Sequence, residues 1–361
     1  MVIKSIELSD YRNYESLQLD FDKGTNILFG NNAQGKTNIL EAIYVAATTK
    51  SHKGSKDNEI INFNKDEAHI RTYLEKNNVN TRVDMHLRKA KSKGIAIDGQ
   101  KIKKAADLMG LCNVVFFSPE DLNIIKDGPS YRRHFVDMEL CQLDSFYLYN
   151  LNNYNKIVNQ RNQLLKELFF NPGLKETLPI WDEQLVSYGN KIIERRRQFA
   201  SQLDEIINKI HKKLSGGTED IHIIYEPDVD ENNYLQKLSI NRERDIKSKM
   251  TSAGPHRDDF SFEINGIDIR KYGSQGQQRT AALSLKLSEI EIVKNITKDT
   301  PILLLDDVLS ELDSNRQNYL LDSIGDIQTI ITCTGLEEFV NDRFTLNKVF
   351  EVNNGVVTCM S

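Results

Sequence analysis

The residues from Gly30 to Thr37 carry the clearest chemical signal in the chain. They read Gly-Asn-Asn-Ala-Gln-Gly-Lys-Thr and fit the pattern Gly-x4-Gly-Lys-Ser/Thr in full. In such a loop the glycines let backbone N–H groups surround phosphate oxygens, the lysine charge faces the β and γ phosphates, and the threonine hydroxyl binds Mg²⁺. We therefore predict a site for ATP and Mg²⁺. The expected nucleotide-binding residues are Gly30, Asn31, Asn32, Ala33, Gln34, Gly35, Lys36, Thr37 and Asn38.

Two carboxylates, Asp306 and Asp307, follow the apolar run 302–305. A continuously apolar run is typical of a strand buried on both faces, and ligands bind at the carboxyl ends of such strands. We expect Asp306 to join Thr37 as a ligand of Mg²⁺. We expect Asp307 to orient the attacking water, because repulsion between adjacent carboxylates raises one pKa and favours a general base. Lys36 and the two aspartates are the predicted catalytic residues.

A second helix start could also hold an anion. The segment 274–277 opens a helix predicted over 277–294, and a helix N-terminus with a free hydroxyl attracts phosphate. A simple N-cap role for the serine is the alternative. Because this segment is far in sequence from the glycine-rich loop, we expect it to act on the ATP held by another copy of the chain. The residues concerned are Ser274, Gln275, Gly276 and Gln277.

Strand patterns must position these residues. Apolar and polar residues alternate in the first thirty residues, and a short apolar run at 26–29 ends at the glycine-rich loop. Helical spacing over 37–44 follows, so strand, loop and helix are predicted in that order. Alternation returns at 68–105, with a hairpin at Asp98-Gly99, and after 250, with another at Asn265-Gly266.

The middle of the chain differs from both ends. Three segments, 145–169, 180–214 and 231–250, have apolar residues at three-to-four spacing among many polar ones. This spacing predicts a helical insertion. The predicted fold is therefore α/β: a P-loop NTPase head with a mixed sheet and helices, built from 1–129 and 250–361, plus an inserted helical lobe over 130–249.

Composition limits the functional classes. The 361 residues include 47 Lys and Arg against 52 Asp and Glu, a net charge of −5, which excludes a globally basic nucleic-acid binder but not a local basic face. Four cysteines without a Cys-x-x-Cys pair do not support a zinc ribbon or a disulfide framework. We see no signal peptide and no apolar run of about 18 residues. We therefore expect a soluble cytoplasmic protein with no membrane partner.

One stretch is locally basic. Residues 88–104 contain seven basic residues and a single acidic one, Asp98. The predicted hairpin could present these charges to DNA phosphates, although a solvated face is the common alternative. The candidate DNA-binding residues are Arg88, Lys89, Lys91, Lys93, Lys101, Lys103 and Lys104.

The order of these elements resembles the ATP-binding-cassette head of the SMC and RecF superfamily. The segments 30–44, 118–137, 253–259 and 304–313 are similar to RecF signatures. The resemblance makes 274–277 the signature segment acting in trans, and makes Ser310 and Asp313 the D-loop. It implies a weak, DNA-stimulated ATPase that serves as a switch, forms an ATP-dependent homodimer and binds double-stranded or junction DNA. With RecR and RecO, such proteins promote RecA loading at gaps in recombinational repair and replication, and slow hydrolysis resets them.

Two other functional classes stay open from the residues alone. A P-loop kinase or transferase for a small molecule would turn over ATP in response to a metabolite and would be indifferent to DNA. A non-catalytic module that merely binds ATP would keep its DNA and partner binding after Lys36→Ala. DNA-stimulated ATP hydrolysis, measured together with sedimentation with and without ATP, separates these classes.

Overall fold

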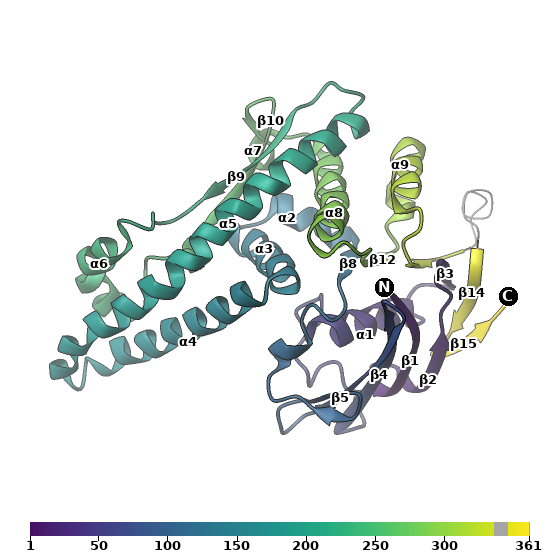
Figure 1. Ribbon diagram of the computed structural model, residues 1–361, viewed down its shortest axis with the longest axis horizontal. Coiled ribbons are helices and arrows are strands. Elements are labelled where there is room, and N and C mark those ends of the chain that lie inside the picture. Colours follow the sequence, from purple (N-terminus) through teal and green to yellow (C-terminus); the bar gives the residue numbers. More distant parts are fainter. Residues whose placement is uncertain (336–345, 361) are drawn as a thin grey trace. The chain divides into compact units, whose positions relative to one another are not determined.

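The computed structural model describes residues 1–335 and 346–360 and divides into two compact units (Figure 1). The first unit consists of Met1–Asp121 and Glu289–Ser361, and the second of Leu122–Ser288. The second unit is therefore larger than the insertion predicted over 130–249. It also takes in residues 250–288, which include the 274–277 segment that we expected in the head.

An antiparallel sheet of six strands forms one layer of the first unit, in the order β2-β1-β4-β5-β6-β7. Asp98 and Gly99 have φ angles of 51° and 80° and join β6 to β7, which confirms the first hairpin. The alternating burial of β4 and β5 leaves one face of this sheet polar. The strands are β1 (Val2–Tyr11), β2 (Tyr14–Asp20), β4 (Glu67–Lys76), β5 (Val79–Arg88), β6 (Gly94–Ile97) and β7 (Gln100–Lys101).

A second sheet in the same unit has the order β15-β14-β3-β13-β12-β8 and is parallel except for β15. Every residue of β12 is buried between β13 and β8, which confirms the doubly buried strand. The central strand β3 pairs with β13 on one side and β14 on the other. The strands are β3 (Thr25–Phe29), β8 (Val114–Phe117), β12 (Ile302–Asp306), β13 (Thr329–Cys333), β14 (Leu346–Asn353) and β15 (Val356–Cys359).

Helix α1 (Lys36–Thr48) lies between the two sheets, against β4 on one side and β8, β12 and β13 on the other. Nearly all of its residues are buried, as expected of a helix that is covered all round. The sequence order of strand, loop and helix is therefore confirmed, and α1 is fixed from both sides. The remaining elements of this unit are η1 (Ala105–Leu108), η2 (Pro119–Asp121), η5 (Leu309–Glu311) and α9 (Ser314–Ile324).

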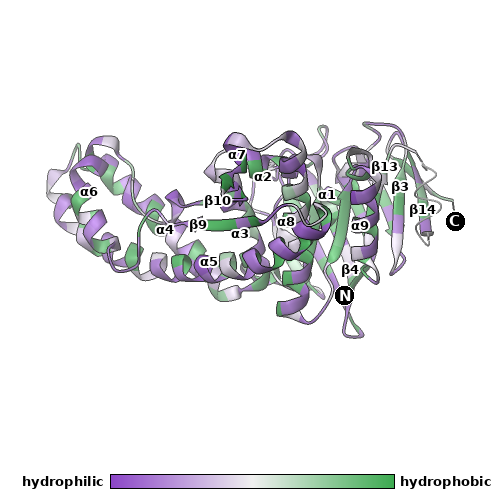
Figure 2. Ribbon diagram, turned by 90° about the horizontal axis from the view of Figure 1, so that it is seen from above, coloured by the Kyte–Doolittle hydropathy of each residue, from purple (hydrophilic) through white to green (hydrophobic). Residues whose placement is uncertain are grey.

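The second unit combines helices with a three-stranded sheet. Its long helices α4, α5 and α6 confirm the three predicted helical segments, and Figure 2 shows polar and apolar residues alternating around them. The sheet has the order β11-β10-β9, and β9 was not predicted. The helices are α2 (Leu122–Lys126), α3 (Pro129–Leu143), α4 (Ser145–Glu167), η3 (Pro172–Thr177), α5 (Leu178–Leu214), α6 (Tyr234–Ser248), η4 (Pro255–Arg257) and α7 (Ile269–Tyr272).

Strand β9 (Ile221–Glu226) pairs antiparallel with β10 (Asp259–Ile264), so the region 130–249 is not wholly helical. The turn from β10 to β11 (Ile267–Asp268) is formed by Asn265 and Gly266, both with positive φ, which confirms the second hairpin. Helix α8 (Gln275–Thr297) follows and runs across the boundary between the two units.

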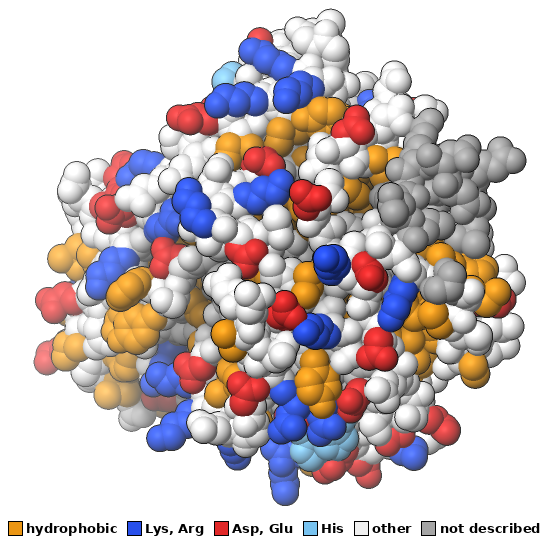
Figure 3. Space-filling view, turned by 45° about the vertical axis from the view of Figure 1, so that its right-hand side comes forward, with side chains coloured by type: hydrophobic (Ala, Val, Ile, Leu, Met, Phe, Trp, Pro, Cys, Tyr) orange, Lys and Arg blue, Asp and Glu red, His pale blue; other side chains and the backbone are white. Residues whose placement is uncertain are grey.

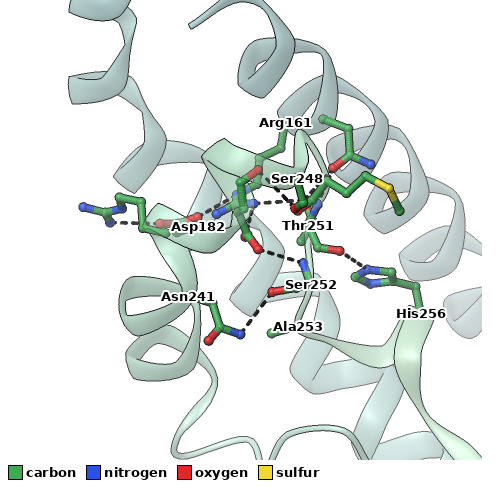
Figure 4. Close-up of polar contacts among 12 residues, drawn as sticks. Arg161, Asp182, Asn241, Ser248, Thr251, Ser252, Ala253 and His256 are labelled. Atoms are coloured by element: carbon green, nitrogen blue, oxygen red, sulfur yellow. Dashed lines mark hydrogen bonds and ion pairs between the residues drawn. The ribbon is translucent and has the colours of Figure 1, made fainter. Parts of the chain in front are cut away.

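A buried ion network holds α4, α5 and α6 together (Figure 4). Arg161 on α4 is fully buried and donates to Asp182 of α5 at 2.8 Å and to Asp245 of α6 at 2.7 Å. It also donates to the Thr251 hydroxyl at 3.0 Å. Arg242 adds a second positive charge, 3.0 Å from Asp182. Each buried carboxylate therefore has a guanidinium partner, as burial of charge requires.

A second buried arginine, Arg196 of α5, joins other parts of the same unit. It donates to Asp137 at 2.7 Å, to Asp258 at 2.8 Å and to the Pro255 carbonyl at 2.7 Å. Burial opposes its charge, but Asp137, Tyr147 and Asp258 more than compensate and raise its pKa well above the ordinary value. Arg196 therefore stays charged and ties α3 and the η4 segment, which precedes β10, to α5.

Candidate nucleotide-binding site

The loop between β3 and α1 needs both of its glycines. Gly30 has φ 149°, and a Cβ there would lie 2.2 Å from the carbonyl oxygen of Val352 on β14. Gly35 has φ 113°, and a Cβ there would lie 2.5 Å from Asn13 Nδ2. A side chain at Gly30 would collide with the backbone of β14, one at Gly35 would meet the Asn13 and Tyr14 side chains, and both φ angles strain any residue other than glycine. Gly35 is also the N-cap of α1, where no side chain caps the helix, so N–H groups of its first turn remain for an anion.

A hollow of about 220 Å³ lies over this loop. The loop residues 32–38 line one side, and the two aspartates at the end of β12, Asp306 and Asp307, line the other. The structure thus brings the predicted Lys36, Thr37, Asp306 and Asp307 to one place. Lys53 and Thr332 also line the hollow and were missed by sequence reasoning.

Asp306 is held by hydroxyl groups rather than by cations. Its Oδ1 accepts from Thr37 Oγ1 at 2.8 Å and from Thr332 Oγ1 at 2.8 Å. Thr332 reaches it because β12 and β13 pair in parallel, with Asp306 opposite Thr332. This cluster offers only oxygen atoms, the donor set that suits a hard cation such as Mg²⁺.

Lys36 is buried and likewise has no carboxylate partner among the described residues. Its Nζ donates to the carbonyl oxygens of Gly30 at 2.5 Å and Asn31 at 2.8 Å. Burial lowers its pKa, against the opposing effect of Asp307, Cys333 and Asp306. The ammonium group is therefore held by neutral groups, beside a hollow whose ligand would be an anion.

Asp307 adopts a left-handed backbone conformation, with φ 54°. Its N–H donates to Thr332 Oγ1 at 3.0 Å, and its carbonyl accepts from Ser310 Oγ at 2.9 Å. Such strain in a residue other than glycine is typical of functional sites. Burial raises the pKa of its carboxyl, and Asp306 adds to this while Lys36 opposes it. These are the properties expected of a general base.

The two predicted D-loop residues follow directly. Ser310 fixes the backbone of Asp307, as described above. Asp313 caps α9 by accepting from the N–H groups of Asn315 and Arg316, both at 3.1 Å. It also accepts from the Arg316 side chain at 2.6 Å. Within this unit, both side chains have a local structural task.

The turn between β1 and β2 supports the loop from behind. Asn13 Nδ2 donates to the Gln34 carbonyl at 3.2 Å, and Asn13 Oδ1 accepts from Asn38 Nδ2 at 2.8 Å. Arg12 makes a bidentate pair with the buried Glu41 of α1, at 2.8 and 2.7 Å. Sequence reasoning gave this polar turn no functional role, so it missed these positioning residues.

The 274–277 segment lies in the second unit. Ser274 Oγ accepts from the Gln277 N–H at 3.2 Å, and Gln277 Oε1 accepts from the Ser274 N–H at 2.9 Å. This reciprocal pair is a capping box, so the N-cap alternative is realised within the single chain. Ser274, Gln275 and Gly276 are nevertheless exposed. A Cβ on Gly276 would meet only Ser274 Oγ, at 3.9 Å.

The basic residues of 88–104 do not form one continuous surface of free charge. Lys93 pairs with Asp57 at 2.9 Å, and Lys89 lies 3.8 Å from Asp66. Arg88 donates to the Ser92 carbonyl at 2.6 Å. Figure 3 shows acidic and basic side chains interspersed on the face that it displays. The remaining four, Lys91, Lys101, Lys103 and Lys104, are exposed.

Comparison with known proteins assigns the chain to a family. Residues 2–358 match the family model described as RecF/RecN/SMC N terminal domain. The chain is 60% identical over 359 residues to the DNA replication and repair protein RecF of Lachnospira eligens, with 99% of each chain covered. The chain belongs to the RecF family. RecF of Lachnoclostridium phytofermentans is 61% identical over 357 residues, again with 99% of each chain covered.

Solved structures agree with this assignment to RecF. A structure described as the recombination mediator protein RecF with ATP, in the RecFOR pathway, has a TM-score of 0.92 at 35% identity. It covers 99% of this chain and 97% of its own. An SMC head bound to the C-terminal winged-helix domain of ScpA, at 16% identity and a TM-score of 0.58, shares the fold alone. The predicted ATPase head of the SMC and RecF superfamily is therefore confirmed, and the small-molecule kinase alternative is not supported.

The same relatives define the role of the family as DNA replication and repair. No described helix has the length and apolar character needed to cross a membrane.

Proposed function

We propose that this RecF-family chain is an ATP-dependent DNA-binding switch of recombinational repair and replication. Two copies close on ATP and clamp double-stranded or junction DNA, and with RecR and RecO they promote RecA loading at gaps. Weak, DNA-stimulated hydrolysis of ATP to ADP and phosphate resets them. The observation that carries the proposal is the cluster of Thr37, Asp306 and Thr332 hydroxyl and carboxylate oxygens beside the buried Lys36.

The loop binds the triphosphate. Its backbone N–H groups and the N-terminus of α1 surround phosphate oxygens, and Lys36 exchanges its two carbonyl partners for the β and γ phosphates. Thr37 and Asp306 hold Mg²⁺, which neutralises phosphate charge when bound. The solved structure of RecF with ATP supports the choice of nucleotide.

Asp307 activates the water. Its carboxylate orients the attacking water and accepts its proton, and the raised pKa brings proton affinity closer to neutral pH. The Asp307 backbone is fixed by Thr332 and Ser310. This rigidity keeps the carboxylate in position without reorganisation during the reaction.

Ser274 of one copy completes the site of the other. None of the described residues of its own chain requires a glycine at 276, because the nearest atom to an added Cβ is 3.9 Å away. A glycine at 276 lets the phosphates of ATP bound in a second copy approach closely, because there is no side chain in the way. The capping box keeps the Ser274 hydroxyl and the first turn of α8 ordered for this contact.

Measurement of dimerisation tests directly whether two copies close on ATP. Asp307→Asn keeps the phosphate ligands but removes the base, so it dimerises with ATP and Mg²⁺ and retains double-stranded DNA. Sedimentation with and without ATP reads out the dimer, and Lys36→Ala, which stays monomeric, is the control. An Asp307→Asn protein that stays monomeric at saturating ATP and Mg²⁺ contradicts the proposal.

A negative charge introduced at position 274 distinguishes the helix-capping role of Ser274 from a contact with ATP bound in another copy. Ser274→Asp preserves the N-cap, since aspartate caps helices as well as serine, but its charge repels a γ-phosphate. We expect unchanged thermal unfolding and loss of ATP-dependent dimers. Ser274→Asn, which caps without charge, is the matched control and retains more dimer. Equal dimerisation of Ser274→Asp and the unaltered protein rejects the contact in trans.

A mixing experiment adds a second test of the same contact. Lys36→Ala and Ser274→Asp are each inactive, but a mixed dimer has one site with an intact loop and an intact serine. Because neither variant forms a dimer with itself, all chains are available for mixed dimers, and an equal mixture recovers up to about one half of the original turnover. No recovery means that each chain completes its own site.

A further inference from the structure

Two histidines and a glutamate meet on the polar face of the antiparallel sheet of the first unit. Glu67 and His69 are two residues apart on β4, so their side chains leave the same face. His86 of β5 lies directly opposite His69 in the register. The potential ligand atoms of the three side chains all lie within 4.8 Å of one another.

The three side chains are already in contact with one another. The rings of His69 and His86 stack, with centroids 4.2 Å apart and an interplanar angle of 19°. His86 Nε2 and Glu67 Oε2 are 2.8 Å apart. A tetrahedral Zn²⁺ with ligands at about 2.0–2.1 Å separates ligand atoms by about 3.3 Å. Small side-chain rotations on a fixed backbone are therefore enough to surround an ion.

Acidic side chains partly balance the cations around the cluster. The nearest strong cation on β4, Arg71, is matched by Asp84 at 2.6 Å and by Glu7 at 3.1 Å. The cationic field at the cluster is thus partly cancelled.

A hollow of about 640 Å³ over the same face provides room for further ligands. His69 and His86 line it, together with polar side chains of β1 and β2 and the cations Arg71, Arg88 and Lys101. Three protein ligands beside an open volume match the arrangement of zinc sites that retain water or an anion in the fourth position. Imidazole ligands select Zn²⁺ and related transition metals over Mg²⁺ or Ca²⁺.

We propose that Glu67, His69 and His86 form a binding site for one divalent transition metal ion of the zinc class. The site is separate from the nucleotide hollow, since none of its ligands lines that hollow. It does not depend on the proposed function.

Titration of the full-length, chelator-treated protein with Zn²⁺ tests the site. We expect one ion per chain, and an affinity about tenfold or more lower in His69→Asn and in His86→Asn. The matched control is His222→Asn, because His222 is also exposed and also lies near a carboxylate, Asp204, at 3.1 Å. The control keeps the full affinity. Circular dichroism checks that each variant is folded.

Cobalt gives an independent readout of the ligands. Co²⁺ in the site produces visible d–d bands without a thiolate charge-transfer band, and both histidine variants lose them. A thiolate band that disappears in Cys359→Ser places the ion at the exposed cysteine instead. Absence of Zn²⁺ binding, or an affinity in both histidine variants equal to that of the unaltered protein, also overturns the proposal.

Discussion

Charges are handled differently in the nucleotide hollow and in the helical part of the second unit. Arg161 is buried against Asp182 and Asp245, so charge meets opposite charge. In the hollow, Lys36 is held by two carbonyl oxygens and Asp306 by two hydroxyl groups. Among the described residues, neither of them belongs to an ion pair. Charges that hold the fold are thus neutralised within the chain, whereas charges that serve a ligand are kept in place by neutral groups.

The largest expected effect is the loss of stability when a buried ion pair of the second unit is broken. Arg161→Met leaves Asp182 and Asp245 buried without their shared partner, and we expect it to lower the free energy of unfolding by about 3–5 kcal/mol. Urea unfolding measures the loss. Arg242→Met is the control, because Asp182 is the one polar partner of this partly exposed arginine among the described residues; the substitution costs about 1 kcal/mol or less.

The triple variant Arg161→Met, Asp182→Leu, Asp245→Leu sharpens the result. Replacing a whole buried ion cluster by apolar side chains is often neutral, so the triple variant loses less stability than Arg161→Met. A greater loss in the triple variant contradicts the view that unpaired carboxylates cause the damage.

Lys36→Ala removes a charge from the nucleotide hollow. We expect ATP turnover to fall about 10²–10³-fold, the effect of losing one preorganised charge. The free energy of unfolding changes by about 1 kcal/mol or less, because only hydrogen bonds to two carbonyls are lost. Turnover assays and urea unfolding on the same preparation measure both. A stability loss as large as that of Arg161→Met would remove the distinction between the two regions.

The pH dependence of turnover probes Asp307. The carboxylate must be ionised to accept a proton, and its pKa is raised above the ordinary value of about 3.9. Turnover is therefore full above the raised pKa and falls about tenfold per pH unit below it. The loss begins at a higher pH than an ordinary aspartate gives. Turnover that stays level to pH 4 in a protein still folded by circular dichroism rules out this base.

The smallest expected effect is a change in the stability of the protein when Asp307 is substituted. A carboxyl with a raised pKa in the folded state destabilises the fold once pH rises through that pKa. Asp307→Asn should therefore increase the free energy of unfolding at pH 7, by about 1 kcal/mol or less after screening. The gain disappears in acid, below the unfolded pKa. Asparagine also accepts the positive φ of this position. Urea unfolding at both pH values measures the difference, and a net loss at pH 7 contradicts it.

Local patterns predicted local structure well. The Asp98-Gly99 and Asn265-Gly266 hairpins, the apolar β12 and the order of β3, loop and α1 all depend on neighbours in sequence. The short strand β9 was missed because its partner β10 begins 33 residues after β9 ends, from Glu226 to Asp259. Only that pairing makes the segment a strand rather than a break between helices.

The same limit applies to the site: residues within one motif could be predicted, whereas contacts between distant segments could not. Lys36 and Thr37 belong to one motif, whereas Thr332 reaches Asp306 only through the register of β13 on β12. Lys53 lies beyond the end of α1, without any motif of its own. Arg161 and Asp245 are 84 residues apart, and the sequence carries no sign that they meet. The roles of the signature, D-loop and basic residues stay predictions.

The position of β3 between β13 and β14 has a consequence for synthesis on the ribosome. The phosphate loop is made early, but the strands that flank β3, and the Val352 carbonyl that abuts Gly30, belong to the last part of the chain. Nascent protein therefore cannot shape the loop until translation has passed β14. We therefore expect a polypeptide that ends before β14 to bind nucleotide more weakly than the full-length chain.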